Sequence, residues 1–145
     1  MEQLLFPLSP DGPTLEVVIG LDGDAMTALQ TASQPIPMPV RVRGMLDTAC
    51  NVTAIAPWIF QHFGIPSRQH SVTQTAGGSH PVSLYFVSLT IPGIVRGGPM
   101  FVQTKLEVIN RAKPIPDLDV LVGMDVMNEC VTLIDGPGRQ FTISF

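Results

Sequence analysis

Segments in which apolar and polar residues alternate predict that this chain is built from β-strands. Alternation with a period of two marks a half-buried strand, and it is present in residues 40–46 and 100–109. The mainly apolar segments 14–20 and 85–91 are also predicted to be strands. Residues 120–122 are apolar throughout, which is typical of a short strand buried on both faces. The chain contains 14 prolines and 13 glycines, so many turns are expected and the pattern indicates an all-β fold.

The alternation in residues 100–109 assigns side chains to the two faces of the predicted strand. One face carries Val102, Thr104, Leu106 and Val108, and the other carries Gln103, Lys105 and Glu107. The pattern therefore predicts a strand with one mainly apolar and one polar face along its whole length.

Two hairpins and two short helices are predicted between and after these strands. The hairpins are 72–84, which turns at the Gly-Gly sequence within 76–79, and 131–145, which turns at 135–138. Proline suits the first position of a helix and glycine suits its end, so one short helix is predicted from Pro57 to Gly64. A second short helix fits residues 124–129, with Asp125 in its first turn, where a carboxylate interacts favourably with the helix dipole.

The length of 145 residues predicts a single domain over 1–145. Segment 22–39 begins with turn residues and contains Pro35, Pro37 and Pro39. Because proline has no N–H group to donate in a sheet, this segment is predicted to be an irregular insertion or loop.

Composition and charge exclude several classes of protein. The net charge is −4, and the 8 basic residues do not cluster, so a nucleic-acid partner is not expected. No apolar run has membrane-spanning length and no signal peptide is recognisable, so no membrane association is expected and a cytoplasmic location follows by default. Charged residues make up only 14% of the chain, which fits a protein that hides surface in an oligomer. The two cysteines, Cys50 and Cys130, cannot form a four-ligand zinc site alone, so no metal is expected.

The segment 40–51 combines a strand with an acidic residue in an unusual position. Asp47 follows directly after Met45 and Leu46, and burial of a carboxylate is costly unless something compensates for it. The next residues, 48–51, are small or short and polar, so they allow the backbone to turn and another chain to approach. The pattern indicates a strand that runs into a tight loop carrying one acid.

Two motifs in this order resemble those of retropepsins, the single-lobed, retroviral-type aspartic proteases. Leu46-Asp47-Thr48-Ala49 is similar to their hydrophobic-Asp-Thr/Ser-Gly loop, although the family has glycine where this chain has Ala49. Residues 120–127 resemble the apolar-apolar-Gly segment that passes behind the catalytic loop and enters a short helix. The glycine-rich hairpin between them resembles the flap that closes over bound peptide.

The resemblance implies a closed retropepsin-like β-barrel with one lobe per chain, a flap hairpin and one or two short helices. It makes Asp47 the catalytic residue, with Thr48, Ala49 and Gly123 supporting the loop. It also implies that peptide is bound by Asn51 and by the flap residues Thr75, Ala76, Gly77 and Gly78.

The resemblance further implies that two copies of the chain are needed for catalysis. Cleavage of an amide requires a base and an acid, and two adjacent carboxyls supply both because they share one proton. A two-fold homodimer provides the second Asp47, so the expected activity is that of a homodimeric aspartic endopeptidase. Water is activated between the two Asp47 carboxyls, the substrate is a peptide or protein, and no cofactor is required. In retropepsins the chain ends usually interleave into a shared sheet, so the apolar last strand, 141–145, is expected at the interface.

Two alternatives remain open from the residues alone. Ala49 keeps open a non-catalytic protein of the same fold that binds peptides or serves as a dimerisation module. The other alternative is a small β-barrel binding domain in which Asp47 only caps a turn. For Asp125, a place near the dimer contact and a purely structural place at a helix start are both consistent with the sequence.

Overall fold

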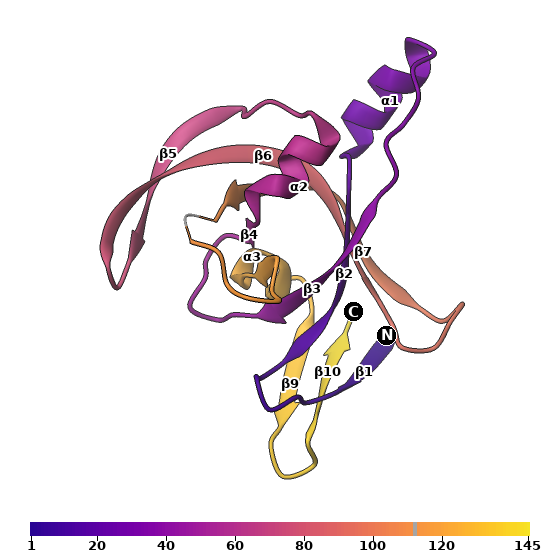
Figure 1. Cartoon of the computed structure of the whole chain (residues 1–145). Coiled ribbons are helices and arrows are strands. Elements are labelled where there is room, and N and C mark those ends of the chain that lie inside the picture. The colour runs from indigo at the N-terminus through magenta and orange to yellow at the C-terminus, as the bar shows by residue number, and fades with distance from the viewer. Residues whose placement is uncertain (112) are drawn as a thin grey trace.

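The computed structural model describes residues 1–111 and 113–145 (Figure 1). The strands in this part of the chain are β1 (Gln3–Pro7), β2 (Thr14–Gly20), β3 (Val40–Leu46), β4 (Ala54–Ile55), β5 (Gln69–Thr75), β6 (Gly78–Pro92), β7 (Met100–Asn110), β8 (Val120–Val122), β9 (Val131–Asp135) and β10 (Gln140–Ser144). The helices are α1 (Gly23–Thr31), α2 (Pro57–Phe63) and α3 (Met124–Met127). The expectation of an all-β fold with a few short helices is confirmed.

Six of the strands close into a mixed β-barrel. Their order is β2-β3-β8-β4-β7-β6, and the pairing of β2 with β6 completes the ring. Two neighbouring pairs, β3 with β8 and β4 with β7, run parallel, whereas the other pairs are antiparallel. β5 pairs only with β6 and therefore extends outside the ring, where the two strands form a long arch (Figure 1).

The core inside the barrel is rich in aliphatic side chains. The fully enclosed side chains include Val17, Ile19, Ile55, Val87, Leu89, Val108, Val120 and Val122. Burial of an aliphatic side chain of this kind stabilises the folded state by roughly 1.5–3 kcal/mol. Helix α2 closes one side of this core, and its Phe60 stacks on Tyr85 of β6 with ring centroids 3.7 Å apart.

The two ends of the chain pair with each other. β1 lies antiparallel to β10, and β10 to β9, in a separate three-stranded sheet, so the N and C termini are adjacent (Figure 1). The backbone N–H groups of Glu2 and Phe145 donate to each other's carbonyl oxygens at 2.8 and 3.0 Å. Phe6 and Phe141 stack on the buried face of this sheet, with centroids 5.0 Å apart. In this chain, then, the terminal strands are paired within one copy, β10 is the central strand, and β1 and β9 are the two edge strands of the sheet.

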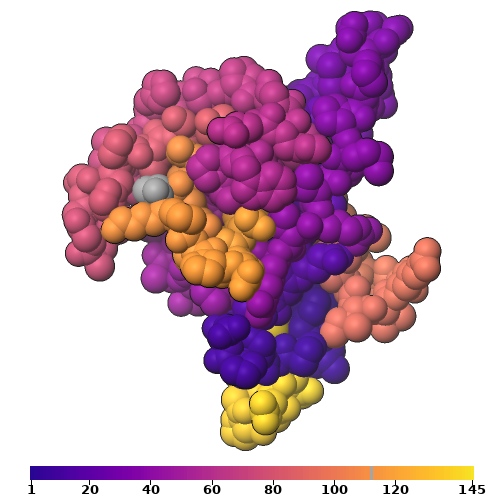
Figure 2. Space-filling model, in the orientation of Figure 1, coloured from indigo at the N-terminus to yellow at the C-terminus, as the bar shows by residue number. Residues whose placement is uncertain are grey.

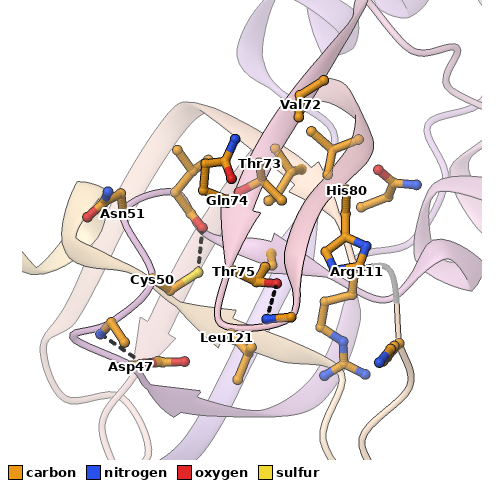
Figure 3. A pocket seen from close by; sticks show the side chains of 18 of the residues that line it. Asp47, Cys50, Asn51, Val72, Thr73, Gln74, Thr75, His80, Arg111 and Leu121 are labelled. Atoms are coloured by element: carbon orange, nitrogen blue, oxygen red, sulfur yellow. Dashed lines mark hydrogen bonds between the residues drawn. The ribbon is translucent and has the colours of Figure 1, made fainter.

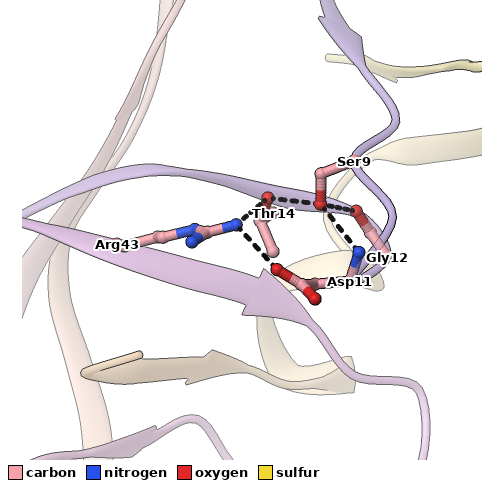
Figure 4. Close-up of polar contacts among 5 residues, drawn as sticks. All are labelled: Ser9, Asp11, Gly12, Thr14 and Arg43. Carbon is pink, nitrogen blue, oxygen red and sulfur yellow. Dashed lines mark hydrogen bonds and ion pairs between the residues drawn. The ribbon is translucent and has the colours of Figure 1, made fainter. Parts of the chain in front are cut away.

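The connection between β1 and β2 is tied to β3 by side chains (Figure 4). Ser9 Oγ donates to the Gly12 carbonyl at 3.0 Å, and Thr14 Oγ1 donates to Ser9 Oγ at 3.1 Å. Arg43 on β3 donates to Thr14 Oγ1 at 3.2 Å and lies 3.5 Å from a carboxylate oxygen of Asp11. Exposed ion pairs of this kind contribute at most about 1 kcal/mol, so these contacts align β2 and β3 more than they stabilise them.

The prediction of which β7 side chains share a face is wrong for the first half of the strand. Phe101 is buried, whereas Val102, predicted on the same face as Leu106 and Val108, is 48% exposed. The pairing with β6 explains the change, because Val87 lies opposite Leu106 but Leu89 lies opposite Gln103. One extra residue on β7 forms a bulge there, and in a strand an extra residue moves every following side chain to the other face.

The prediction that 22–39 is irregular is also wrong in its first half, where the chain forms α1. Asp22 caps this helix, since its carboxylate accepts a hydrogen bond from the Asp24 N–H at 3.2 Å. None of the helical residues is fully buried, although Ala25 and Leu29 pack against the edge of the core. Residues 32–39 contain no helix or strand. Figures 1 and 2 show α1 projecting from the barrel.

The remaining local predictions agree with the structure, apart from two missed strands. The strands over 14–20 and 120–122, the last hairpin and the helix from Pro57 are all present, and Gly64 ends that helix with φ of 64°. β1 and β4 were not predicted. Among the described residues, no helix is long and apolar enough to cross a membrane.

Candidate active site

The loop that carries Asp47 is anchored to β8 and α3 by backbone hydrogen bonds. Asp47 N–H donates to the Val122 carbonyl at 2.9 Å, which continues the parallel pairing of β3 with β8 by one residue. Further along, Met124 N–H donates to the Cys50 carbonyl at 2.7 Å, and Asp125 N–H donates to the Asn51 carbonyl at 3.2 Å. These bonds join segments far apart in sequence and fix the path of the loop.

Gly123 lies where the two segments come closest. A Cβ atom at this position would lie 2.6 Å from the Cys50 carbonyl oxygen and 3.0 Å from the Val52 carbonyl carbon. Both neighbours are backbone atoms, so neither can move without disturbing the loop. The close approach therefore requires glycine, and a φ of −90° shows that the requirement comes from space rather than from backbone conformation.

Asp47 itself is half-buried at the start of a tight turn. Its carboxylate accepts a hydrogen bond from the Ala49 N–H at 3.0 Å, and its carbonyl accepts one from the Cys50 N–H at 3.1 Å. The described non-glycine residues with positive φ are Ser33, Asp117 and Arg139, so Ala49 has a backbone conformation that any L-residue can adopt. The side chains of Thr48 and Ala49 are exposed.

A contact between Asp125 and the buried Thr53, which the sequence did not reveal, holds the far end of the loop. The Asp125 carboxylate accepts from the Thr53 N–H at 2.9 Å and from the Thr53 hydroxyl at 2.7 Å. Thr53 is completely buried, and its hydroxyl oxygen accepts from the Gly123 N–H at 3.1 Å. Asp125 also accepts from the Val126 N–H at 2.9 Å, so one carboxylate links the loop to the first turn of α3. The only signal in the sequence was a threonine beside the apolar pair Ala54-Ile55.

A cleft of about 770 Å³ opens between this loop and the arch formed by β5 and β6. Of the predicted site residues, it is lined by Asp47, Ala49, Asn51, Thr75, Ala76 and Gly77. Thr48, Gly78 and Gly123 do not line it. Figure 3 shows Asp47, Cys50 and Asn51 along one side of the cleft, with the residues of the arch across from them. The volume is in the range of ligand-binding pockets.

The arch is a hairpin, as predicted, but its turn is shorter than the expected 76–79 and consists of Ala76 and Gly77. Thr75 pairs with Gly78 across the turn, and Gly78 has φ of 110°, a conformation that favours glycine. Thr75 Oγ1 accepts from the Gly77 N–H at 3.2 Å. β5 packs little against the rest of the chain, and its Val72 side chain is 61% exposed. A hairpin with so few buried contacts opens more readily than the barrel beneath it.

The surroundings of Cys50, the one cysteine in the loop, raise the pKa of its thiol. Burial raises the pKa of the Cys50 thiol, and the carboxylates of Asp47 and Asp125 raise it further, while a hydrogen bond with Val52 opposes the change. The thiol donates to the Val52 carbonyl at 2.8 Å and therefore serves the loop as a protonated donor. Among the described residues, no group of three His, Cys, Asp or Glu side chains is placed to hold a metal ion.

Comparison with solved structures identifies the fold. A retropepsin-like aspartic protease from Rickettsia conorii superposes with a TM-score of 0.60 over 99% of this chain and 91% of that chain, at 13% sequence identity. This chain has the retropepsin-like fold. The simian foamy virus (mac) protease matches at 14% identity over 79% of this chain and 91% of its own, with a TM-score of 0.45. The sequence matches no protein-family model, and no curated protein sequence is significantly similar to it.

The retropepsin-like fold brings together the two motifs and the hairpin that the sequence singled out. The Asp47 loop, the Gly123 segment and the arch come from three separate parts of the chain and meet around one cleft. Both hypotheses, the protease and the non-catalytic peptide-binding protein, are consistent with this fold and this cleft.

Proposed function

We propose that this chain is an aspartic endopeptidase that acts as a homodimer. The observation that carries the proposal is the position of Asp47, which lines a ligand-sized cleft beneath a hairpin within a retropepsin-like fold. Its loop is held by backbone bonds and by the contact of Asp125 with the buried Thr53, as the precise positioning of a reacting carboxylate requires. A peptide fits this cleft as an extended segment that pairs with the hairpin through its main chain.

The chemistry requires a second Asp47 from a partner copy. With the two carboxyls side by side, one is ionised and takes a proton from the attacking water, while the other is protonated and donates to the leaving amine. The Thr48 side chain is exposed and forms no hydrogen bond to the described residues, so its hydroxyl is free to bond to the partner's loop. Ala49 narrows the cleft by one methyl group compared with glycine and makes the enzyme slow or selective.

The terminal sheet offers the partner a surface. β9 is one of the two edge strands of that sheet, and its Val131, Leu133 and Ile134 side chains are 59%, 59% and 51% exposed. Leu5, on the face shared with Leu133, is 52% exposed. An open edge with apolar side chains readily pairs with another strand. We therefore place β9 in the dimer interface, together with the Asp47 loop.

Cleavage of a mixed peptide library, read by mass spectrometry, tests the proposal. The wild-type protein is expected to cleave best at mildly acidic pH with a bell-shaped pH profile, because one carboxyl is ionised and the other protonated. Asp47→Asn is expected to fold and to cleave nothing, whereas Asp24→Asn, at an exposed acid on α1, retains activity. Cleavage by Asp47→Asn, or activity in a protein that stays monomeric by analytical ultracentrifugation, overturns the mechanism. A wild-type protein that binds library peptides and cleaves none is instead a non-catalytic peptide-binding protein.

A further inference from the structure

A buried arginine lies at the edge of the same cleft and has few partners. Arg111 follows β7 directly, lines the cleft and is only 8% exposed. Its Nη1 donates to the Leu118 carbonyl at 2.7 Å. Its Nε is enclosed and has no hydrogen-bond partner among the described residues. A guanidinium carries five N–H donors, so most of its capacity is unused within the described chain.

The charge of Arg111 is not closely paired either. Burial lowers the pKa of the guanidinium and the charge of Asp119 opposes this change, but an arginine remains charged in either case. No ion pair within 4.0 Å joins Arg111 to an acid in the described part of the chain. Asp119 instead accepts a hydrogen bond from the Trp58 ring N–H at 2.9 Å. A buried cation without a close anion is costly, so its retention at the cleft suggests a partner from outside the chain.

A second cation lies beside Arg111 in the cleft. Lys113 also lines it, and Asp47 is its one acidic lining residue in the described chain. In Figure 3, Arg111 is seen on the side of the cleft away from Asp47, with Leu121 between them in the view. A negatively charged group bound there would meet Arg111 and Lys113 without approaching the carboxylate of Asp47.

We propose that Arg111 selects peptides that present a carboxylate to this part of the cleft, carried by a glutamate or aspartate side chain. The proposal rests on the proposed function only in that it takes a peptide to be the ligand of the cleft. Arginine suits this task because its planar fork can donate two parallel hydrogen bonds to one carboxylate. Lys113 is exposed and adds a screened attraction at the rim.

The hydrogen bond to Leu118 suggests an alternative, structural role for Arg111, in which it supports the segment 113–119. Such a role would affect the binding of all peptides equally, because it would act through the shape of the cleft. Selection by charge would affect only peptides that carry a carboxylate. A comparison of matched glutamate and glutamine peptides therefore separates the two roles.

The experiment measures peptide binding to the Asp47→Asn variant, so that no probe is cleaved. The probes are fluorescent decapeptides of alanine and leucine with blocked ends, in which one glutamate occupies each position in turn, and each has a glutamine counterpart. A further glutamine peptide with a free C-terminal carboxylate shows whether a chain end can replace the side chain. Binding is measured by fluorescence anisotropy in the Asp47→Asn background, with and without Arg111→Met or Lys113→Met.

At one or more positions, glutamate is expected to bind at least about tenfold more tightly than glutamine, the usual order for a buried charge-assisted hydrogen bond. Arg111→Met should reduce this ratio to about twofold or less, and Lys113→Met should change it much less. The inference is overturned if no position prefers glutamate, if the preference survives in Arg111→Met, or if only the free C-terminal carboxylate is selected. If Arg111→Met does not fold, the ratio of glutamate to glutamine binding is compared between the Asp47→Asn protein and its Arg111→Lys variant. Lysine keeps the positive charge but lacks the planar pair of N–H donors of arginine.

The two proposals fail in different ways. If the protein binds glutamate peptides selectively but cleaves nothing, the endopeptidase proposal is refuted and the role proposed for Arg111 is supported. If the wild-type protein cleaves peptides without any preference between glutamate and glutamine, the role proposed for Arg111 is refuted and the endopeptidase proposal is supported.

Discussion

Replacement of Asp125 by alanine tests whether this carboxylate holds the loop that carries Asp47. The change removes the acceptor for the Thr53 N–H, the Thr53 hydroxyl and the Val126 N–H. Thr53 is completely buried, so water cannot replace the lost partner without a rearrangement. An unsatisfied buried donor costs about 1–3 kcal/mol, and two donors of Thr53 are affected, so we expect the free energy of unfolding to fall by about 3 kcal/mol. For a chain of this length, that corresponds to a decrease in Tm on the order of 10 °C.

Two further variants make the comparison specific. Asp125→Asn keeps one carbonyl oxygen for the Thr53 N–H, and its amide can donate to the Thr53 hydroxyl oxygen, so a loss of only about 1 kcal/mol is expected. Asp24→Ala removes a carboxylate that pairs with Lys105 at 2.7 Å and whose side chain is 80% exposed. Exposed pairs contribute about 1 kcal/mol at most, so this control should unfold almost as the wild type does.

Urea and thermal unfolding, followed by circular dichroism, measure these differences. All proteins must be compared at one concentration, because the proposed dimerisation would make Tm depend on concentration. The order of stability should be wild type, Asp24→Ala and Asp125→Asn close together, and then Asp125→Ala well below. If Asp125→Ala unfolds at the same urea concentration as Asp24→Ala, the contact with Thr53 does not hold the loop and the reasoning is refuted.

Two other predictions concern the loop itself. Ala49→Gly should lower the free energy of unfolding by about 1 kcal/mol or less and leave kcat/KM on short peptides unchanged or higher; a folded variant with much lower activity contradicts this. The raised pKa of the Cys50 thiol means that the folded state retains this proton at a pH where the unfolded chain has lost it. The associated stability is therefore present at neutral pH and is lost as pH rises through the pKa of the folded state. Iodoacetamide should modify Cys50 more slowly in the folded than in the unfolded protein, and faster in Asp47→Asn; equal rates by mass spectrometry contradict this.

Local patterns were sufficient to predict the elements that frame the site. The strand ending at Leu46, the apolar strand before Gly123 and the hairpin that turns at Ala76-Gly77 each depend on neighbouring residues. Their side-chain periods and turn residues are readable in any short window of sequence. This is why the all-β class and these elements could be predicted without coordinates, whereas the site residues on the loop and the hairpin were expected only from the resemblance to retropepsins.

The missed features depend on contacts between distant residues. β4 contains only Ala54 and Ile55, too few for a period, and exists because it pairs with β7 and β8. The bulge in β7 is defined only by its register with β6. The partner of Thr53 is 72 positions away, and Arg111 resembles an ordinary charged residue after a strand until its burial is known. None of these contacts leaves a pattern in a local window.

Gly44 and Gly123 allow the strand and loop that carry Asp47 to lie close to the β8 segment. A Cβ at Gly44, on β3, would lie 2.7 Å from a methyl carbon of Val17 and 3.3 Å from the Val120 carbonyl oxygen. Gly44 pairs with Val120 and Gly123 meets Cys50, so the strand that ends in Asp47 is in close contact with the β8 segment on both sides of the acid. Backbone bonds and the Asp125–Thr53 contact within the chain hold the loop. In the proposed homodimer, the loop is therefore already held by its own chain, and association would supply the second carboxyl rather than the fold.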